Sequence, residues 1–176
     1  MFKTGEEVRL ACREGRWQRP TSGLTYGYIQ ANLVVLDKDW ARDFLVFAQR
    51  NPKPCPILEV GEIGTYQTKF LAKGADIRTD LPKYRIYKHG TLKEELKDIS
   101  NLWSDRLVFF LLGCSFSFEQ FLLEAGVEVR HITENVNVPM YVTNMMCAGA
   151  GRFPDCPMVV SMRPLSTSDA IKAVEI

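Results

Sequence analysis

Residues 107–126, with the sequence LVFFLLGCSFSFEQFLLEAG, carry the clearest fold signals in this chain. The first six residues are an unbroken apolar run, which is typical of a strand buried on both faces. Residues 113–116 predict a turn. The capping box that begins at Ser117 and ends at Gln120 predicts the start of a helix, and Gly126 predicts its end. The segment is therefore interpreted as a buried strand, a tight turn and a helix.

The sequence before this unit alternates between strand and helix signals. A strand is expected over 28–36, and a short strand over 56–60. Between them, Asp37 or Asp39 is the expected N-cap of a helix that ends at Asn51, because Pro52 disfavours helical backbone in the residue before it. Loops and short strands are expected over 62–90. A second capping box, Thr91 to Glu94, predicts a helix that extends to Trp103.

The pattern changes after Gly126. Short strands are expected over 127–132, 138–142 and 158–162, followed by a helix from Ser166 or Ser168 to the last residue. These patterns together predict an α/β protein, with a mixed sheet that contains some parallel pairing in a layered α/β domain, and with a smaller α+β lobe. The expected boundaries are 1–126 for the layered domain and 127–176 for the lobe.

Composition excludes several classes of protein. The chain has 176 residues, of which 46% are hydrophobic, and its formal net charge is +1. A nearly neutral chain does not provide the positive electrostatic field that attracts nucleic acid, so no nucleic-acid partner is expected. The longest apolar run is far shorter than the roughly 20 residues needed to cross a bilayer, and the amino terminus has no leader pattern. The expected location is cytoplasmic, without a membrane partner.

The five cysteines are widely spaced and odd in number, and the two histidines pair with no nearby cysteine or histidine in the sequence. These features argue against a zinc site and a disulfide framework, so no metal and no cofactor are expected. Any acid–base chemistry is therefore expected to depend on carboxylates, cysteine, tyrosine or lysine.

The turn after the central strand is the first candidate site. Ligands bind at the carboxyl ends of strands in α/β sheets, and the first turn of a helix offers free N–H groups to an anion. Cys114, Ser115 and Ser117 would lie near that anion, and Glu119 would lie in the first helical turn. A purely structural interpretation stays open. In it Ser117 only caps the helix, Cys114 is a small buried side chain, and Glu119 complements the helix dipole.

Three further places offer polar groups. Arg78 and Asp80 lie in the polar loop 76–82, where a guanidinium could clamp a substrate carboxylate. The alternative is a solvated turn held by an internal ion pair between aspartate and arginine. Asn32 is an amide within an otherwise apolar strand, and it must find a partner. Arg163 places a cation at the end of a strand.

Taken together, these segments resemble the hydro-lyase family that includes mitochondrial D-glutamate cyclase. The resemblance covers the amino-terminal two thirds of the family, since members continue beyond the Ser-Met-Arg-Pro stretch. The matching stretches, in the family's order, are 21–23, 27–33, 50–56, 76–84, 113–119, 137–141, 143–144 and 159–164.

The resemblance implies a carbon–oxygen lyase that removes water from a small amino or hydroxy acid. In the cyclase, D-glutamate closes to 5-oxo-D-proline. The roles that follow are hypotheses. One arginine clamps a carboxylate, backbone N–H groups of 114–117 together with the serines hold the other carboxylate, an acid moves protons, and an amide orients the substrate. A cysteine is a candidate nucleophile. The residues proposed for these roles are Glu119, Asp80 and Cys114 for catalysis, and Arg78, Arg163, Asn32, Ser115 and Ser117 for substrate binding.

One alternative to this interpretation stays open, and one expectation about assembly accompanies it. The chain could be a non-catalytic remnant of the family that binds small carboxylates or another protein. A homo-oligomer is also expected if apolar surface is left bare, because large exposed apolar patches tend to pair.

Overall fold

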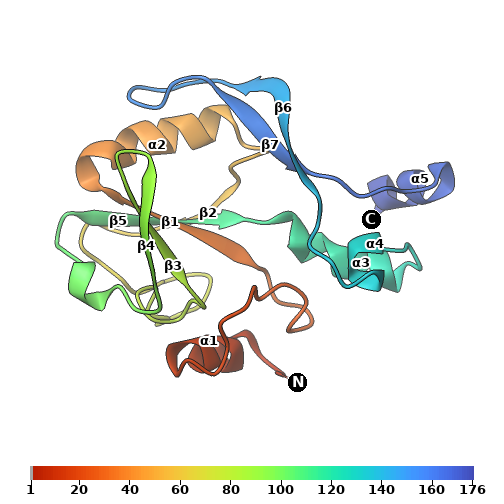
Figure 1. Ribbon diagram of the computed structural model, residues 1–176, viewed down its shortest axis with the longest axis horizontal. Helices are drawn as coiled ribbons and strands as arrows, with labels where there is room; N and C mark the ends of the chain where they lie inside the picture. The colour runs from red at the N-terminus through yellow and green to blue at the C-terminus, as the bar shows by residue number, and fades with distance from the viewer. Residues whose placement is uncertain (1) are drawn as a thin grey trace.

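Figure 1 shows the computed structural model of the protein, which describes residues 2–176. Helices and short antiparallel sheets mix along the chain, so the predicted α/β class is confirmed. The elements before residue 107 are α1 (Gly5–Arg13), β1 (Ala31–Asp37), α2 (Lys38–Arg50), β2 (Ile57–Val60), β3 (Tyr84–Lys88), β4 (Thr91–Leu96) and η1 (Ser100–Leu102). They are followed by β5 (Leu107–Gly113), η2 (Ser115–Phe118), α3 (Glu119–Glu124), α4 (Arg130–Thr133), β6 (Met140–Cys147), β7 (Cys156–Ser161) and α5 (Thr167–Glu175).

The central sheet has three strands in the order β1-β5-β2, with the predicted buried strand β5 in the middle. The expected parallel pairing is wrong, because β5 is antiparallel to both neighbours. The β1–α2–β2 unit is nevertheless a crossover between strands that point the same way. Strand β5, which comes later in the sequence, is inserted between them and runs the opposite way, so both strand pairings in this sheet are antiparallel.

The two faces of β5 pack into different clusters, as side-chain alternation along a strand requires. On one face, Val108 and Phe110 pack against Phe44 and Phe47 of α2. On the other face, Phe109 and Leu111 pack against Ile77 of the loop that precedes β3. This double burial explains the unbroken apolar run.

The predicted helix α2 begins and ends as expected. The Asp37 carboxylate accepts a hydrogen bond from the Asp39 N–H at 2.9 Å, which confirms Asp37 as the N-cap. At the other end, the buried Asn51 side chain donates to Ala148 O at 2.8 Å and accepts from Ala148 N at 2.8 Å. Asn51 therefore ties the end of α2 to the loop between β6 and β7. The expected boundary at Gly126 stays a prediction.

The helix predicted from the Thr91–Glu94 capping box is wrong, since Thr91–Leu96 is strand β4. It pairs with β3 in a hairpin whose turn, His89 and Gly90, has positive φ at both positions (50° and 74°). Two such residues form the turn that suits a tight hairpin. Glu95 adds ion pairs to β3, with Lys83 at 2.8 Å and Arg85 at 2.9 Å. Pairing with β3 thus prevails over a local capping signal.

Of the other predicted helices and strands, some are confirmed and some are wrong. The carboxyl-terminal helix is confirmed, with Ser166 as the N-cap of α5. The strand expected over 127–132 is wrong, because Arg130–Thr133 is the short helix α4. The amino-terminal helix α1 was not predicted, although Thr4 caps it by accepting a hydrogen bond from Glu7 N at 3.2 Å. Among residues 2–176, no helix is long and apolar enough to cross a membrane.

Candidate functional site

A buried polar cluster lies where η2, α3, α4 and the end of β7 meet. Its centre is the Glu119 carboxylate, whose Oε1 accepts hydrogen bonds from Arg163 Nε at 2.8 Å and from Arg163 Nη2. The same oxygen lies 3.2 Å from His131 Nε2. Two hydroxyls complete the cluster: Arg163 Nη1 donates to Ser161 Oγ at 3.0 Å, and Nη2 donates to Ser115 Oγ at 3.2 Å. We call these five residues the Glu119 cluster.

The elements of the cluster explain how distant residues reach one carboxylate. Ser115 opens η2 immediately after β5, and Glu119 is the first residue of α3. Ser161 ends β7, and Arg163 follows it two residues later. The two serine hydroxyls lie 3.2 Å apart, so the end of β7 is held directly against η2.

The side chains at the centre of this cluster are almost completely buried. The side chains of Glu119, His131 and Arg163 are only 6%, 9% and 10% exposed. The Arg163 guanidinium also lies over the rings of Phe116 and Phe118, at 5.9 and 5.1 Å from their centroids. A charge pair removed from water in this way interacts far more strongly than a surface pair. The ion pair between Glu119 and Arg163 therefore provides an environment for proton transfer that contains little water.

A cavity of about 190 Å³ borders the cluster. His131 lines it, so one histidine side chain contacts both the buried carboxylate and the cavity. The other lining residues are Arg130, Glu134, Val136, Pro139, Met162 and Pro164. The cavity is small, which suits a small molecule better than a polymer.

The structure brings together only part of the predicted site. Glu119, Arg163 and Ser115 meet in the cluster, and Cys114 directly precedes Ser115. The predicted cap role of Ser117 is wrong, because no side chain caps α3 and the Ser117 hydroxyl instead accepts a hydrogen bond from Gln30 N at 3.1 Å. Nearby, Gln30 Oε1 is buried without a hydrogen-bond partner among the described residues. Asn32 lies on β1 and is exposed.

Asp80 and Arg78 lie apart from the cluster, in the loop that covers the face of the sheet opposite α2. Asp80 is buried and forms an ion pair with Arg13 of α1 at 2.7 Å. Arg78 donates to both carboxylate oxygens of Asp76, at 2.9 and 2.7 Å, and its guanidinium lies 3.3 Å from the centroid of the Tyr66 ring. Arg78 thus belongs to an ion pair within the loop, as the structural alternative expected, whereas the buried Asp80 ties the loop to Arg13 of α1.

The ion pair between Asp76 and Arg78 leads to a prediction about acid stability. Burial works against ionisation, but the hydrogen bonds from Arg78 outweigh it and hold the pKa of Asp76 below its ordinary value of 3.8. A lowered pKa in the folded state stabilises the fold above the ordinary value, and this contribution is lost as the pH falls through the lower one. We therefore expect Asp76→Asn to cost about 1 kcal/mol at pH 7.

The measurement is urea unfolding of the protein and of Asp76→Asn at several pH values. The difference between them should stay constant from pH 7 to about pH 5 and shrink below about pH 4. Asp105→Asn is the matched control, because Asp105 is exposed and forms no ion pair among the described residues. A difference that grows on acidification would contradict this role of Asp76.

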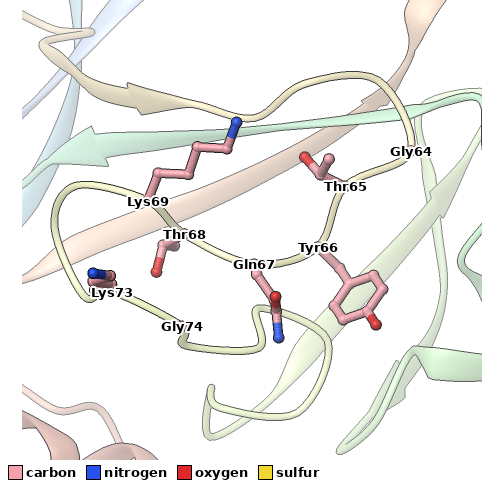
Figure 2. Close-up of a pocket in the computed structure, with 8 residues that line it drawn as sticks. All are labelled: Gly64, Thr65, Tyr66, Gln67, Thr68, Lys69, Lys73 and Gly74. Atoms are coloured by element: carbon pink, nitrogen blue, oxygen red, sulfur yellow. The ribbon is translucent and has the colours of Figure 1, made fainter.

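A larger concavity of about 570 Å³ lies elsewhere, along the loop from Gly64 to Gly74 (Figure 2). Thr65, Tyr66, Thr68 and the lysines Lys69 and Lys73 line it. Of the eight residues that line this groove, none is a carboxylate, a histidine or a cysteine. The groove offers a tyrosine and two lysines but no pairing of a carboxylate with a histidine like the one beside the smaller cavity, and we place the candidate site at the Glu119 cluster.

Two members of the cluster were missed by sequence reasoning. His131 and Ser161 come from different elements, and His131 belongs to no recognisable motif. Ser161 lies in the stretch Ser-Met-Arg-Pro, two residues before Arg163, so it could have been found through Arg163. No local signal identifies His131, because only the fold of α4 brings it to Glu119. Among residues 2–176, no group of three or more His, Cys, Asp or Glu side chains is arranged to hold a metal ion.

Comparison with known proteins places this site in a family. The model described as D-glutamate cyclase matches residues 108–176, which include the whole Glu119 cluster. Proteins named "Putative hydro-lyase" from Geobacillus kaustophilus and Clostridium beijerinckii are 54% and 55% identical to the chain over 98% and 97% of its length. "Putative hydro-lyase YcsI" from Bacillus subtilis is 55% identical over 97% of the chain.

The chain spans only part of these relatives, namely 65%, 64% and 66% of their lengths. Within that part the match extends over nearly the whole chain at 54–55% identity, and the family model covers the segment from β5 to the last helix. The chain therefore belongs to the D-glutamate cyclase family.

Proposed function

We propose that this chain provides the acid–base site of a hydro-lyase for a small amino or hydroxy acid, and that D-glutamate is the substrate. The observation that carries the proposal is the position of Glu119 Oε1. This buried oxygen lies between the guanidinium of Arg163 and the imidazole of His131, 3.2 Å from Nε2, beside a small cavity. Membership of the D-glutamate cyclase family supports the same reaction.

The reaction needs proton transfer at two places. The α-ammonium of D-glutamate loses a proton, and the resulting amine attacks the side-chain carboxyl carbon to form a tetrahedral species. A carbon–oxygen bond then breaks. Both protons lost from nitrogen end on the departing oxygen, so the products are 5-oxo-D-proline and one molecule of water. An enzyme must accept the first proton, stabilise the oxyanion and protonate the leaving oxygen.

The cluster offers a group for each task. His131 borders the cavity and contacts Glu119, so it is placed to exchange protons with a bound substrate. Glu119 orients the imidazole, as a buried carboxylate does for a catalytic histidine. The Ser115 and Ser161 hydroxyls accept hydrogen bonds from Arg163 and share one hydrogen bond with each other, which leaves one hydroxyl proton to donate to a carboxylate oxygen.

This assignment modifies the roles expected for the two arginines. Asp76 already occupies Arg78 on its hydrogen-bonding edge, and Tyr66 covers its face. Arg163 also has a carboxylate partner, so it acts through the serines and Glu119 instead of as an open clamp. Arg130, which lines the cavity beside His131, is the better candidate for binding the substrate carboxylate.

The test is conversion of D-glutamate, with L-glutamate as the stereochemical control, followed as 5-oxoproline by mass spectrometry. We expect product from D-glutamate only. His131→Asn and Glu119→Gln should lower kcat by about 100-fold or more, the usual contribution of a general acid or base. The assay is made on this chain and, at the matched positions, on full-length YcsI of Bacillus subtilis.

Arg85→Gln is the control variant, because Arg85 lies on the exposed hairpin β3–β4, where it forms an ion pair with Glu95 and, among the described residues, no hydrogen bond or ion pair with the Glu119 cluster. Circular dichroism of every variant separates loss of chemistry from loss of fold. If folded His131→Asn turns over D-glutamate at the normal rate, the proposed site is wrong. Binding of glutamate without conversion in both proteins would favour the non-catalytic alternative.

A further inference from the structure

The outer face of the β6–β7 hairpin is apolar and bare. Neither strand contains a charged residue, although exposed strands are normally protected by charges. Val142 and Val159 are directly opposite each other in the ladder, and they are 73% and 57% exposed. The neighbouring exposed apolar side chains of these strands are Met140, Tyr141, Met145 and Met146.

The other face of the same hairpin is covered where it lies over α2, although Tyr141, which faces that side, is 52% exposed. Cys156 and Met158 of β7 pack into the core cluster formed with α2, together with Cys147 of β6. Side chains alternate along a strand, so Val159 points away from that core and Ser161 lies on the same side as Val159. The bare face therefore continues along β7 towards the Glu119 cluster.

Helix α5 extends this surface. It has no buried residue, and its apolar side chains Ile171 and Val174 are 60% and 88% exposed. Figure 1 shows α5 standing to the side of the sheets, beyond the end of β7. Large exposed apolar patches commonly mark binding surfaces.

The relatives supply a candidate occupant. They match this chain almost from end to end at about 54% identity, so they contain the same hairpin and the same last helix. They are also longer, because the chain spans only about 65% of their length. We infer that the outer face of the β6–β7 hairpin, with α5, is the docking surface for the polypeptide segment that makes up the remaining third of the relatives.

This placement has a structural consequence for the candidate site. Because Ser161 continues the outer row of β7, a segment docked over Val142 and Val159 lies beside the Glu119 cluster and shields it from water. The inference itself depends on exposed apolar surface and not on turnover. A measurement of stability therefore tests it separately from the proposed function.

The test replaces the opposed pair by opposite charges, Val142→Lys with Val159→Glu, so that attraction across the ladder preserves the hairpin. In this chain alone the melting temperature should change by less than about 2 °C, because both side chains are exposed. In full-length YcsI, the same change at the matched positions should lower the melting temperature by about 5 °C or more, because a docked segment would bury the new charges.

The matched control is Tyr87→Lys with Leu92→Glu, an opposed apolar pair on the β3–β4 hairpin that is 58% and 43% exposed. It should be nearly neutral in both proteins. An unchanged melting temperature for the β6–β7 variant of YcsI would overturn the inference, and so would an equal fall in the two proteins. If light scattering shows that this chain forms a dimer that the β6–β7 substitutions dissociate, a second copy is the occupant and the inference is wrong.

Discussion

Replacing Arg163 by alanine should lower the free energy of unfolding by about 3–5 kcal/mol, because it leaves a buried carboxylate without its partner. Glu119 is only 6% exposed, and Arg163 is its closest cation. Serine hydroxyls at 3.0 and 3.2 Å would also lose their donor. The loss is a large part of the 5–15 kcal/mol that holds an ordinary domain together.

The measurement is urea unfolding of Arg163→Ala, Glu119→Gln and the double variant. The double variant should be more stable than Arg163→Ala, since the glutamine no longer carries an unpaired buried charge. Arg106→Ala is the matched control. Its ion pairs with Asp37 and Asp39 are at the surface, and its removal should cost far less stability than removal of Arg163. Equal losses for Arg163→Ala and Arg106→Ala would contradict this account of the cluster.

Phe109→Ala should also cost about 3–5 kcal/mol, because it opens a cavity in the middle of the central sheet. Phe109 is fully buried, and its ring packs so closely on Gly61 that a methyl group there would lie 2.2 Å from a ring carbon. The same contact explains why glycine follows β2 at this position. The side chain thus fixes the spacing between β5 and the segment beyond β2.

Phe70→Ala is the matched control for this prediction. Phe70 is 81% exposed, so losing its ring should change the free energy of unfolding by less than about 0.5 kcal/mol. Both variants are compared by chemical denaturation at the same pH. A small loss for Phe109→Ala, similar to that of Phe70→Ala, would mean that the packing of this face of β5 is loose.

These two predictions concern different layers of the molecule. Phe109 belongs to the sheet that the apolar run at 107–112 already predicted. Arg163 belongs to a cluster that joins residues 44 positions apart, in which Glu119 takes part both in the stabilising ion pair and in the proposed acid–base site. We therefore expect variants of Glu119 to affect stability and turnover together, which is why His131→Asn, outside the Glu119–Arg163 ion pair, is the more informative catalytic variant.

Local signals were sufficient for the elements whose ends are marked by nearby residues. Asp37 and Asn51 mark the ends of α2, Ser166 marks the start of α5, and the apolar run marks β5. In each of them a cap, a proline or a buried run acts over one or two turns of chain. The same kind of signal was present for α1 in Thr4 and Glu7, so this helix was predictable although it was not predicted.

Short capping motifs were insufficient where another segment competed for the backbone. Thr91 to Glu94 satisfies the capping-box pattern, yet pairing with β3 through a two-residue turn at His89 and Gly90 prevails. Ser117 likewise satisfies the pattern, but its hydroxyl binds the backbone of Gln30, 87 residues away. A pattern of four residues provides one or two hydrogen bonds, and a ladder or a packed loop offers several.

The sequence by itself determined the α/β class, the buried central strand, the helices α2 and α5 and the family, because apolar periodicity, caps and motifs act over short stretches of chain. Only the tertiary structure decided that β5 lies antiparallel between β1 and β2, that Arg78 and Asp80 hold a loop and α1, and that His131 meets Glu119 and Arg163. These outcomes depend on which distant surfaces become buried together. That choice minimises exposed apolar area and unpaired charge over the whole chain, and no local stretch of sequence records it.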